Sequence, residues 1–228
     1  MKINILRYIE GAKKARGAVV IIDVFRAFSV ECYATANNVR KIIPVASKEL
    51  AYELREKNPG YLLVGERGGI KLPDFDYGNS PTEIEHLDLT GKVIVHTTSA
   101  GTQGLENARG ADKILTGSLV NAKAIADYIK ANRFEEVSLV AMGNEGVREA
   151  QEDDLCALYI KALLEERPLD ITQQIESLKT AGGERFFDGL RSDMFPERDF
   201  YLCTALNAFD FVLQFKYDSD GLGYIVKV

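Results

Sequence analysis

The chain has 228 residues, of which 46% are hydrophobic, and a formal net charge of -6. A chain of this length and composition buries a substantial core, so a folded globular protein is expected. The acidic balance and the lack of a basic run argue against a nucleic-acid partner, and the apolar runs are too short to cross a membrane. With no secretory pattern at the amino terminus, we expect a cytoplasmic protein that holds any anionic ligand by a few local cations.

Short apolar runs alternate with helical stretches along the chain. The expected strands lie at 19–24, 41–45, 61–64, 92–97, 113–115 and 137–142. The expected helices lie at 29–37, 48–58, 102–108, 122–132 and 151–166. This alternation indicates an α/β fold. The chain continues as helix from 171 to 207 and ends in a hairpin of two strands, 211–217 and 223–228.

No linker, repeat or low-complexity tract interrupts the chain, so we expect residues 1–228 to form one compact unit. The chain has three cysteines, and no two of them are close in the sequence. This favours buried structural thiols over disulfides or a zinc site. Of the two histidines, His86 lies in a polar connector and is expected at the surface. His96 lies within an apolar strand, where a structural role is the favoured interpretation.

The first candidate site follows the apolar strand at 19–24. It delivers Asp23 and Arg26 to the carboxyl end of the strand, where open α/β sheets bind their ligands. A carboxylate suits Mg²⁺, and a guanidinium meets a phosphate or sulfonate in bidentate fashion. The alternative is a helix cap at Asp23 and a surface ion pair at Arg26. An aspartyl-phosphate mechanism is disfavoured, because Phe25 stands where a second aspartate is needed.

The second candidate site is the long loop at 65–80, which follows a strand and is rich in charged and turn-forming residues. Its chemistry-bearing side chains are Glu66, Arg67, Asp74, Asp76 and Asn79. The segment 80–83 reads Ser-Pro-Thr-Glu, which predicts a capping box and a helix start that binds an anion beside Arg67. The alternative for the aspartates and the asparagine is ordinary turn formation.

Two further strand ends carry polar residues. The turn after 92–97 holds Thr97, Thr98 and Thr102, whose hydroxyl and N–H groups are suited to a phosphate. The turn after 137–142 leads to Glu152 and Asp153 at a helix start, where acidic residues also favour the helix dipole. Oxygen ligands from several strand ends are the usual way to hold Mg²⁺ beside a phosphate.

These segments in this order resemble the 2-phosphosulfolactate phosphatase family. The matching stretches are Ile-Asp-Val-Phe-Arg-Ala at 22–27, Gly-Glu-Arg at 65–67, Phe-Asp-Tyr-Gly-Asn-Ser-Pro at 75–81, Thr-Thr-Ser-Ala-Gly-Thr at 97–102 and Glu-Asp-Asp at 152–154. The resemblance implies a three-layer α/β/α fold of two similar intertwined α/β parts with the active site between them. It also implies Mg²⁺-dependent hydrolysis of 2-phosphosulfolactate to sulfolactate and phosphate, a step towards coenzyme M. Phe28 and the turn at 99–101 depart from the family pattern beside the expected anion pocket.

We assign roles to these residues on the combined grounds of residue type and resemblance. The predicted catalytic residues are Asp23, Arg26, Glu66 and Asp76, the last as a base. The predicted substrate-binding residues are Arg26, Arg67, Asn79, Thr97, Thr98 and Thr102. The predicted Mg²⁺ ligands are Asp23, Glu66, Glu152 and Asp153.

The partner is expected to be a small anionic phosphate monoester, with no nucleic acid and no membrane. A homodimer stays an open alternative to a monomer. Two other functions are also open: hydrolysis of another small phosphorylated acid, and non-catalytic phosphate binding. Positioning and charge neutralisation must dominate catalysis of this slow reaction, and a metal supplies both. Water is favoured as the nucleophile over a covalent intermediate.

Overall fold

The computed structural model describes residues 1–228 and confirms an α/β fold. Its ten strands are β1 (Lys2–Arg7), β2 (Gly17–Ile22), β3 (Lys41–Pro44), β4 (Leu62–Arg67), β5 (Ile70–Lys71), β6 (Val93–Thr97), β7 (Ala111–Gly117), β8 (Glu136–Ala141), β9 (Leu213–Tyr217) and β10 (Gly223–Lys227). Its nine α-helices are α1 (Tyr8–Lys14), α2 (Ala27–Ala36), α3 (Lys48–Lys57), α4 (Pro81–Ile84), α5 (Gly101–Asn107), α6 (Ala122–Ala131), α7 (Gln151–Leu164), α8 (Thr172–Ser177) and α9 (Glu197–Thr204).

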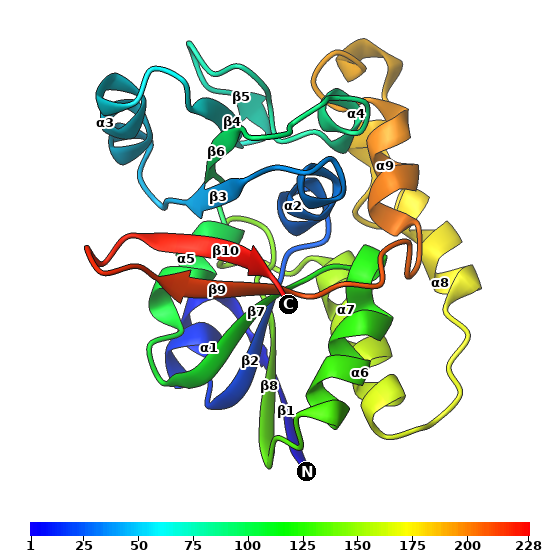
Figure 1. Ribbon diagram of the computed structural model, residues 1–228. Helices are drawn as coiled ribbons and strands as arrows, with labels where there is room; N and C mark the ends of the chain where they lie inside the picture. The colour runs from blue at the N-terminus through cyan, green and yellow to red at the C-terminus, as the bar shows by residue number, and fades with distance from the viewer.

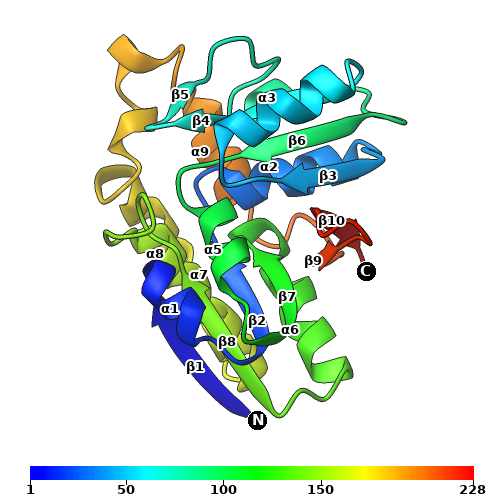
Figure 2. The same ribbon diagram turned by 90° about the vertical axis from the view of Figure 1, so that its left-hand side faces the viewer.

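All ten strands form one sheet in the order β1-β8-β2-β7-β9-β10-β3-β6-β4-β5. Strands β1, β8, β2 and β7 pair in parallel in one half, and β3, β6 and β4 pair in parallel in the other. The antiparallel hairpin β9–β10 joins the halves by pairing with β7 and β3. The chain builds β1 and β2 of the first half, crosses to the second, and returns for β7 and β8 (Figure 1). The strands of the second half run crosswise to those of the first (Figure 2).

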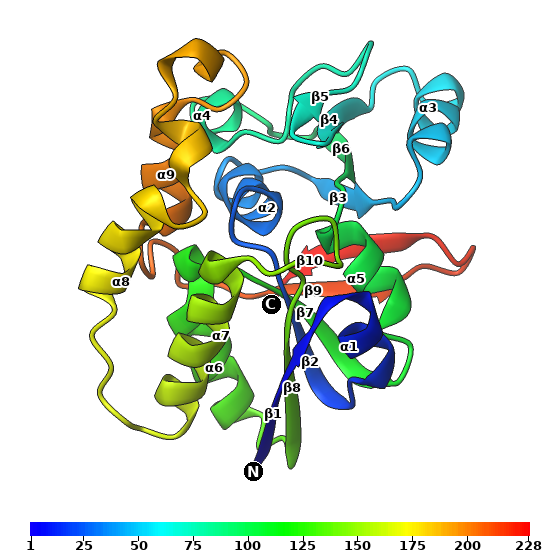
Figure 3. The same cartoon turned by 180° about the vertical axis from the view of Figure 1, so that it is seen from behind.

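Helices cover both faces of each half. In the first half, α6 and α7 pack on one face while α1 and α5 pack on the other (Figure 3). Strand β2 shows the reason, because Val20 and Ile22 belong to the core under α6 and α7, whereas Val19 and Ile21 belong to the opposite core. A strand buried on both faces reads as a continuous apolar run. In the second half, α3 packs over a third core on one face and α2 lies on the other.

The observed elements differ from the predicted ones at both ends of the chain. Strand β1 and helix α1 were not predicted, since the mixed polar and apolar residues at 2–14 show no clear period. The long helix expected at 171–207 is wrong: α8 and α9 are separated by short turns that include Gly182, at φ +112°, and Pro196. Neither residue suits a helix interior. None of the helices is both long and apolar enough for a transmembrane span.

Three local predictions are confirmed, on the cysteines, on His86 and on the terminal hairpin. All three cysteines are free and buried, and the His86 side chain is 80% exposed. The terminal hairpin forms with its turn at Asp218, whose carboxylate accepts the N–H groups of Asp220 and Leu222. Acceptance of nearby N–H groups by an aspartate is the usual way in which this residue stabilises a turn.

Candidate active site

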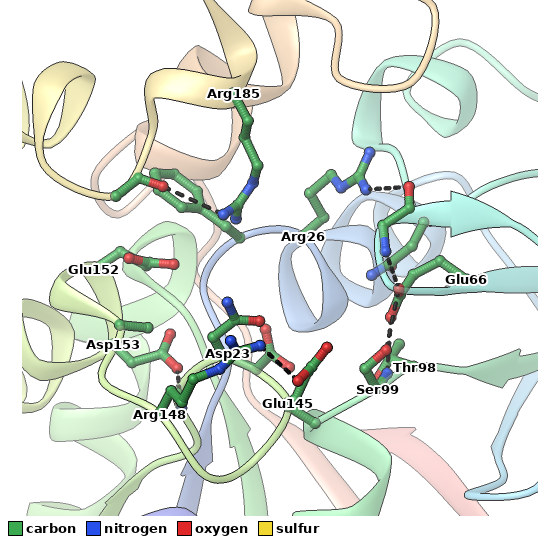
Figure 4. A pocket seen from close by; sticks show the side chains of 18 of the residues that line it. Asp23, Arg26, Glu66, Thr98, Ser99, Glu145, Arg148, Glu152, Asp153 and Arg185 are labelled. Atoms are coloured by element: carbon green, nitrogen blue, oxygen red, sulfur yellow. Dashed lines mark hydrogen bonds and ion pairs between the residues drawn. The ribbon is translucent and has the colours of Figure 1, made fainter. Parts of the chain in front are cut away.

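A polar cavity of about 550 Å³ lies where the two halves of the sheet meet. Only four of its 23 lining residues are hydrophobic, so it suits a small polar ligand. Its walls come from the carboxyl ends of β2 and β8 in one half and of β4 and β6 in the other, and from the start of α7. A segment that precedes α9 closes the remaining side (Figure 4). Seven of the predicted site residues line the cavity: Asp23, Arg26, Glu66, Asn79, Thr98, Glu152 and Asp153.

Asp23 and Glu152 are the buried cavity carboxylates with the least protein hydrogen bonding. Asp23 is only 9% exposed. Burial, and then repulsion from Glu66 and Glu152, raises the pKa of Asp23 to about 8. Burial likewise raises the pKa of Glu152 to about 7, and its Oε2 atom has no hydrogen-bond partner. The nearby Arg185 guanidinium opposes both pKa shifts, but neither carboxyl forms a salt bridge, and buried carboxyl groups with raised pKa values are typical of a functional site.

Glu66 and Asp153 also line the cavity, and each ties two loops together. Glu66 accepts the backbone N–H of Ser99 at 2.8 Å and that of Gly69 at 2.6 Å, which joins the end of β4 to the turn after β6. Asp153 accepts the N–H of Val24 at 2.8 Å and that of Gly143 at 2.9 Å, which joins the ends of β2 and β8. These carboxylates therefore hold the cavity walls in place. Glu66 Oε2 also accepts the Ser99 hydroxyl at 3.2 Å, whereas Glu66 Oε1 and both Asp153 oxygens each keep a second lone pair for a ligand.

Arg26 lines the cavity, but its guanidinium is bound by the protein. It donates to the carbonyl oxygens of Met194 at 2.9 Å and Gly69 at 3.0 Å, and its Nη1 lies 3.4 Å from Asp199 Oδ2. The ion pair with Asp199 is buried and not, as the alternative held, at the surface. Arg26 thus fastens the segment before α9 to the second half of the sheet.

Four other predicted residues, Arg67, Thr97, Asp76 and Thr102, do not line the cavity. Arg67 donates to the carbonyl oxygens of Glu66 and Ala46 and to Thr97 Oγ1. Since side chains alternate along a strand, Glu66 and Arg67 point to opposite faces of β4. The structure therefore brings Glu66 into the site and turns Arg67 away.

Asp76 and Thr102 stabilise local structure instead. Asp76 Oδ2 accepts the N–H of Leu63 at 2.7 Å and pairs with Arg55, which holds the loop after β5 against β4. Thr102 and Thr98 cap each other at the start of α5, where each backbone N–H donates to the hydroxyl of the other residue. Of this pair only Thr98 reaches the cavity wall.

The predicted capping box at 80–83 is wrong. Ser80 precedes α4 with no side-chain cap, and its hydroxyl donates to Asp199 Oδ1 at 2.7 Å. The same oxygen accepts the N–H of Thr82 at 3.0 Å, so a distant aspartate caps this helix. Pro81 does occupy the first turn, as predicted. With Asp199 at its start, α4 is no anion site.

The sequence missed the basic side of the cavity, which comes from the segment before α9. Arg185 and Arg191 line the cavity, and the ring of Phe195 lies among three guanidinium groups. The Phe195 ring centroid lies 4.7 Å from the guanidinium carbon of Arg26, 5.7 Å from that of Arg185 and 4.8 Å from that of Arg191. Burial lowers the pKa of Arg185, while nearby Glu152 opposes that shift. The one available signal was the Gly182-Gly183 pair, which breaks the helical pattern three residues before Arg185.

The ion pairs around the cavity leave an unbalanced arrangement of charge. Arg26 pairs with Asp199, and Arg148 pairs with Glu145 at the rim. Arg185 makes one hydrogen bond, to the Gly182 carbonyl oxygen at 3.3 Å, and forms no salt bridge. The cavity therefore has an acidic side, formed by Asp23 and its neighbouring carboxylates, and a basic side at Arg185 (Figure 4), to which the lining residue Arg191 adds a second guanidinium through the shared Phe195 ring. Such an arrangement is suited to a cation and an anion bound next to each other.

Comparison with known proteins agrees with this geometry. A model of the family described as 2-phosphosulpholactate phosphatase matches residues 5–218. A probable 2-phosphosulfolactate phosphatase of Carboxydothermus hydrogenoformans is 40% identical over 223 residues, which cover 93% of this chain and 92% of that protein. Proteins with the same description from Clostridium perfringens and Bacillus subtilis are 31% and 30% identical, over 95% and 88% of this chain and 94% and 88% of their own lengths. The chain belongs to the 2-phosphosulfolactate phosphatase family, a family of phosphoric monoester hydrolases.

Proposed function

We propose that this protein hydrolyses 2-phosphosulfolactate to sulfolactate and phosphate with the help of Mg²⁺. The observation that carries the proposal is the pairing of an acidic and a basic side within one cavity, next to the family membership of the chain. A substrate with a phosphate, a carboxylate and a sulfonate needs several cationic contacts. A role in the coenzyme M pathway rests on the family resemblance alone.

The donor set of the acidic side fits Mg²⁺. Asp23, Glu66 and Glu152 are all buried, carry hard oxygen donors and lack a salt bridge, and Glu152 Oε2 has no partner. No three such groups form a ready-made ligand cluster. Mg²⁺ commonly keeps several waters and takes only one or two carboxylates together with substrate phosphate, so it does not require such a cluster. Asp23 and Glu152, with the least hydrogen bonding, would hold the ion, and Glu66 and Asp153 would complete its surroundings.

When bound, the ion would neutralise charge on a phosphoryl oxygen and favour deprotonation of water. Arg185 and Arg191 bind the anionic groups of the substrate, and Arg26 keeps the segment that carries them in place. The hydroxyl of Thr98 and the amide of Asn79 supply neutral polar contacts from the second half of the sheet. Asp76 lies outside the cavity, so we no longer propose it as the base. The cavity carboxylates are the groups available to take a proton from water.

The direct test is phosphate release from synthetic 2-phosphosulfolactate, measured beside a panel of other small phosphorylated acids. We expect turnover with Mg²⁺ and its loss when a chelator removes the metal. Faster turnover of another phosphorylated acid would favour the broader phosphatase function. Phosphate binding without release from any ester would instead favour a non-catalytic module.

The raised carboxyl pKa values predict how the metal-free protein responds to pH. In the unfolded chain these carboxyls ionise near pH 4, whereas in the folded protein Asp23 and Glu152 have pKa values of about 8 and 7. A folded pKa above the unfolded value gives stability at low pH that is lost as the pH rises through the folded pKa. We therefore expect the melting temperature without metal to fall from about pH 4 to about pH 8, and to change little from this cause at higher pH.

Magnesium should reverse this loss, because it binds the ionised carboxylates of the folded protein only. Thermal melting at a series of pH values, with Mg²⁺ and with chelator, is the measurement. The Asp23→Asn protein serves as the control, since it lacks the carboxyl group with the larger shift and should show a flatter profile. A melting temperature that rises over this range, or that ignores Mg²⁺, would contradict the prediction.

A further inference from the structure

A buried chain of polar side chains leads from helix α2 to the cavity wall. Glu31 of α2 and His96 of β6 are each 1% exposed, and Asn79, which lines the cavity, is 5% exposed. His96 Nδ1 lies 3.1 Å from Glu31 Oε1, and His96 Nε2 lies 3.1 Å from Asn79 Oδ1. The histidine therefore bridges a carboxylate in the core and an amide at the site.

The contact at Asn79 determines where its amide points. An amide oxygen only accepts hydrogen bonds, so His96 Nε2 must carry the proton that it donates to Asn79 Oδ1. The NH₂ group of Asn79 has no acceptor within the protein, and the residue lines the cavity. Asn79 thus presents two N–H donors to the cavity and no acceptor, which is the orientation that an anionic oxygen requires.

The fold alone gives little reason for this arrangement. Burying a carboxylate and an imidazole is costly, and Glu31 Oε2 is buried without any partner. Two apolar side chains of similar volume often give equal or greater stability at such positions. The arrangement does, however, fix the ring: Glu31 binds Nδ1, which leaves Nε2 directed at Asn79. Glu31 Oε1 accepts a hydrogen bond from Nδ1, so a ring that also donates from Nε2 carries a proton on both nitrogens and forms a buried ion pair with Glu31.

We propose that His96 is a positioning residue which, held by Glu31, orients the Asn79 amide to donate hydrogen bonds to a phosphate or other anionic oxygen of the substrate. The proposal rests on the phosphatase function proposed above. It gives His96 a role beyond the structural one that its sequence position suggested, because the ring that satisfies Glu31 also sets the donor at the site.

Two substitutions of His96 give a matched test. The amide nitrogen of a glutamine falls near the Nε2 position of histidine, so His96→Gln keeps a donor to Asn79. An asparagine amide falls near Nδ1, so His96→Asn keeps a contact with Glu31 and loses the one with Asn79. We expect kcat/KM for 2-phosphosulfolactate to fall less than about threefold in the first protein and about tenfold or more in the second. Equal losses in both, following their melting temperatures, would mean a structural role and overturn the proposal.

A double-mutant cycle with Asn79→Ala tests the route of the effect. If His96 acts through Asn79, His96→Asn should reduce kcat/KM less than about twofold once the amide is absent. Additive losses in the cycle would overturn the proposal. The same cycle measured on binding of inorganic phosphate with Mg²⁺ serves if the wild-type protein hydrolyses no ester.

The proton position can be read without any turnover. The chain has only two histidines, and His86 is exposed, so ¹⁵N-labelled histidine gives one buried and one solvent-exposed ring to assign. We expect both nitrogens of the buried ring to be protonated in the wild-type protein, Nδ1 towards Glu31 and Nε2 towards Asn79. An unprotonated Nε2 would mean that the Asn79 amide is reversed, and it would overturn the proposal whatever the substrate proves to be.

Discussion

Asp23→Asn is expected to reduce kcat by about a hundredfold to a thousandfold while the protein becomes more stable. The carboxyl group stands at the end of β2, is buried, and faces Glu66 and Glu152. Its charge therefore repels both neighbours in the metal-free protein and is useful only when a cation is bound. An asparagine of the same shape removes the repulsion, the desolvation cost and the proposed metal ligand together.

The measurements are kcat at saturating Mg²⁺ and the melting temperature of the metal-free protein at about pH 9, where the wild-type carboxyl is largely ionised. Asp76→Asn is the matched control, since the same chemical change falls outside the cavity. That protein should lose stability, because Asp76 accepts the Leu63 N–H and pairs with Arg55, and should keep kcat within about threefold. Wild-type activity in Asp23→Asn would remove Asp23 from the site.

The sequence predicted the acidic side of the cavity because that side is built locally. Each contribution is an apolar strand followed at once by a polar residue, as at Asp23 and Thr98, and parallel strands bring their carboxyl ends to one edge. The intertwined halves place two such edges against each other. The strand pattern marked Asp23 and Glu66, whereas Glu152 at the start of α7, and the meeting of the two halves in one cavity, were predicted with the help of the family resemblance.

The errors come from side-chain direction and from distant contacts. Arg67 follows Glu66 directly on β4, so alternation excludes both from one face, and that rule was available from the sequence. The cap of α4 was not available, because Asp199 lies more than 100 residues further along the chain. Arg185 and Arg191 lie in a segment without a regular period, whose position is set by the tertiary contacts of Arg26.

Arg185→Ala is expected to lower the preference for 2-phosphosulfolactate over 2-phospholactate, which keeps the phosphate and the carboxylate but lacks the sulfonate. Arg185 has one carbonyl partner and no salt bridge, so most of its five N–H donors remain for the substrate. If Arg185 binds the sulfonate, removal of that group leaves a partly buried cation unpaired, which raises the transition-state free energy by about 1 to 3 kcal/mol. Wild-type kcat/KM should therefore differ at least about tenfold between the two esters, since 1.4 kcal/mol corresponds to a factor of about ten.

The alanine protein should lose most of this difference by slowing on 2-phosphosulfolactate while changing little on 2-phospholactate. Arg185→Lys should recover only part of it, because an ammonium does not reproduce a bidentate fork. Arg67→Ala provides the contrast, since the sequence favoured that arginine for the same role. With its donors committed to Glu66, Ala46 and Thr97, Arg67 should affect melting temperature and leave the preference intact. Equal turnover of the two esters by the wild-type protein would reject sulfonate recognition. Loss of the preference in Arg67→Ala would instead show that Arg67 of β4 is the residue that binds the sulfonate.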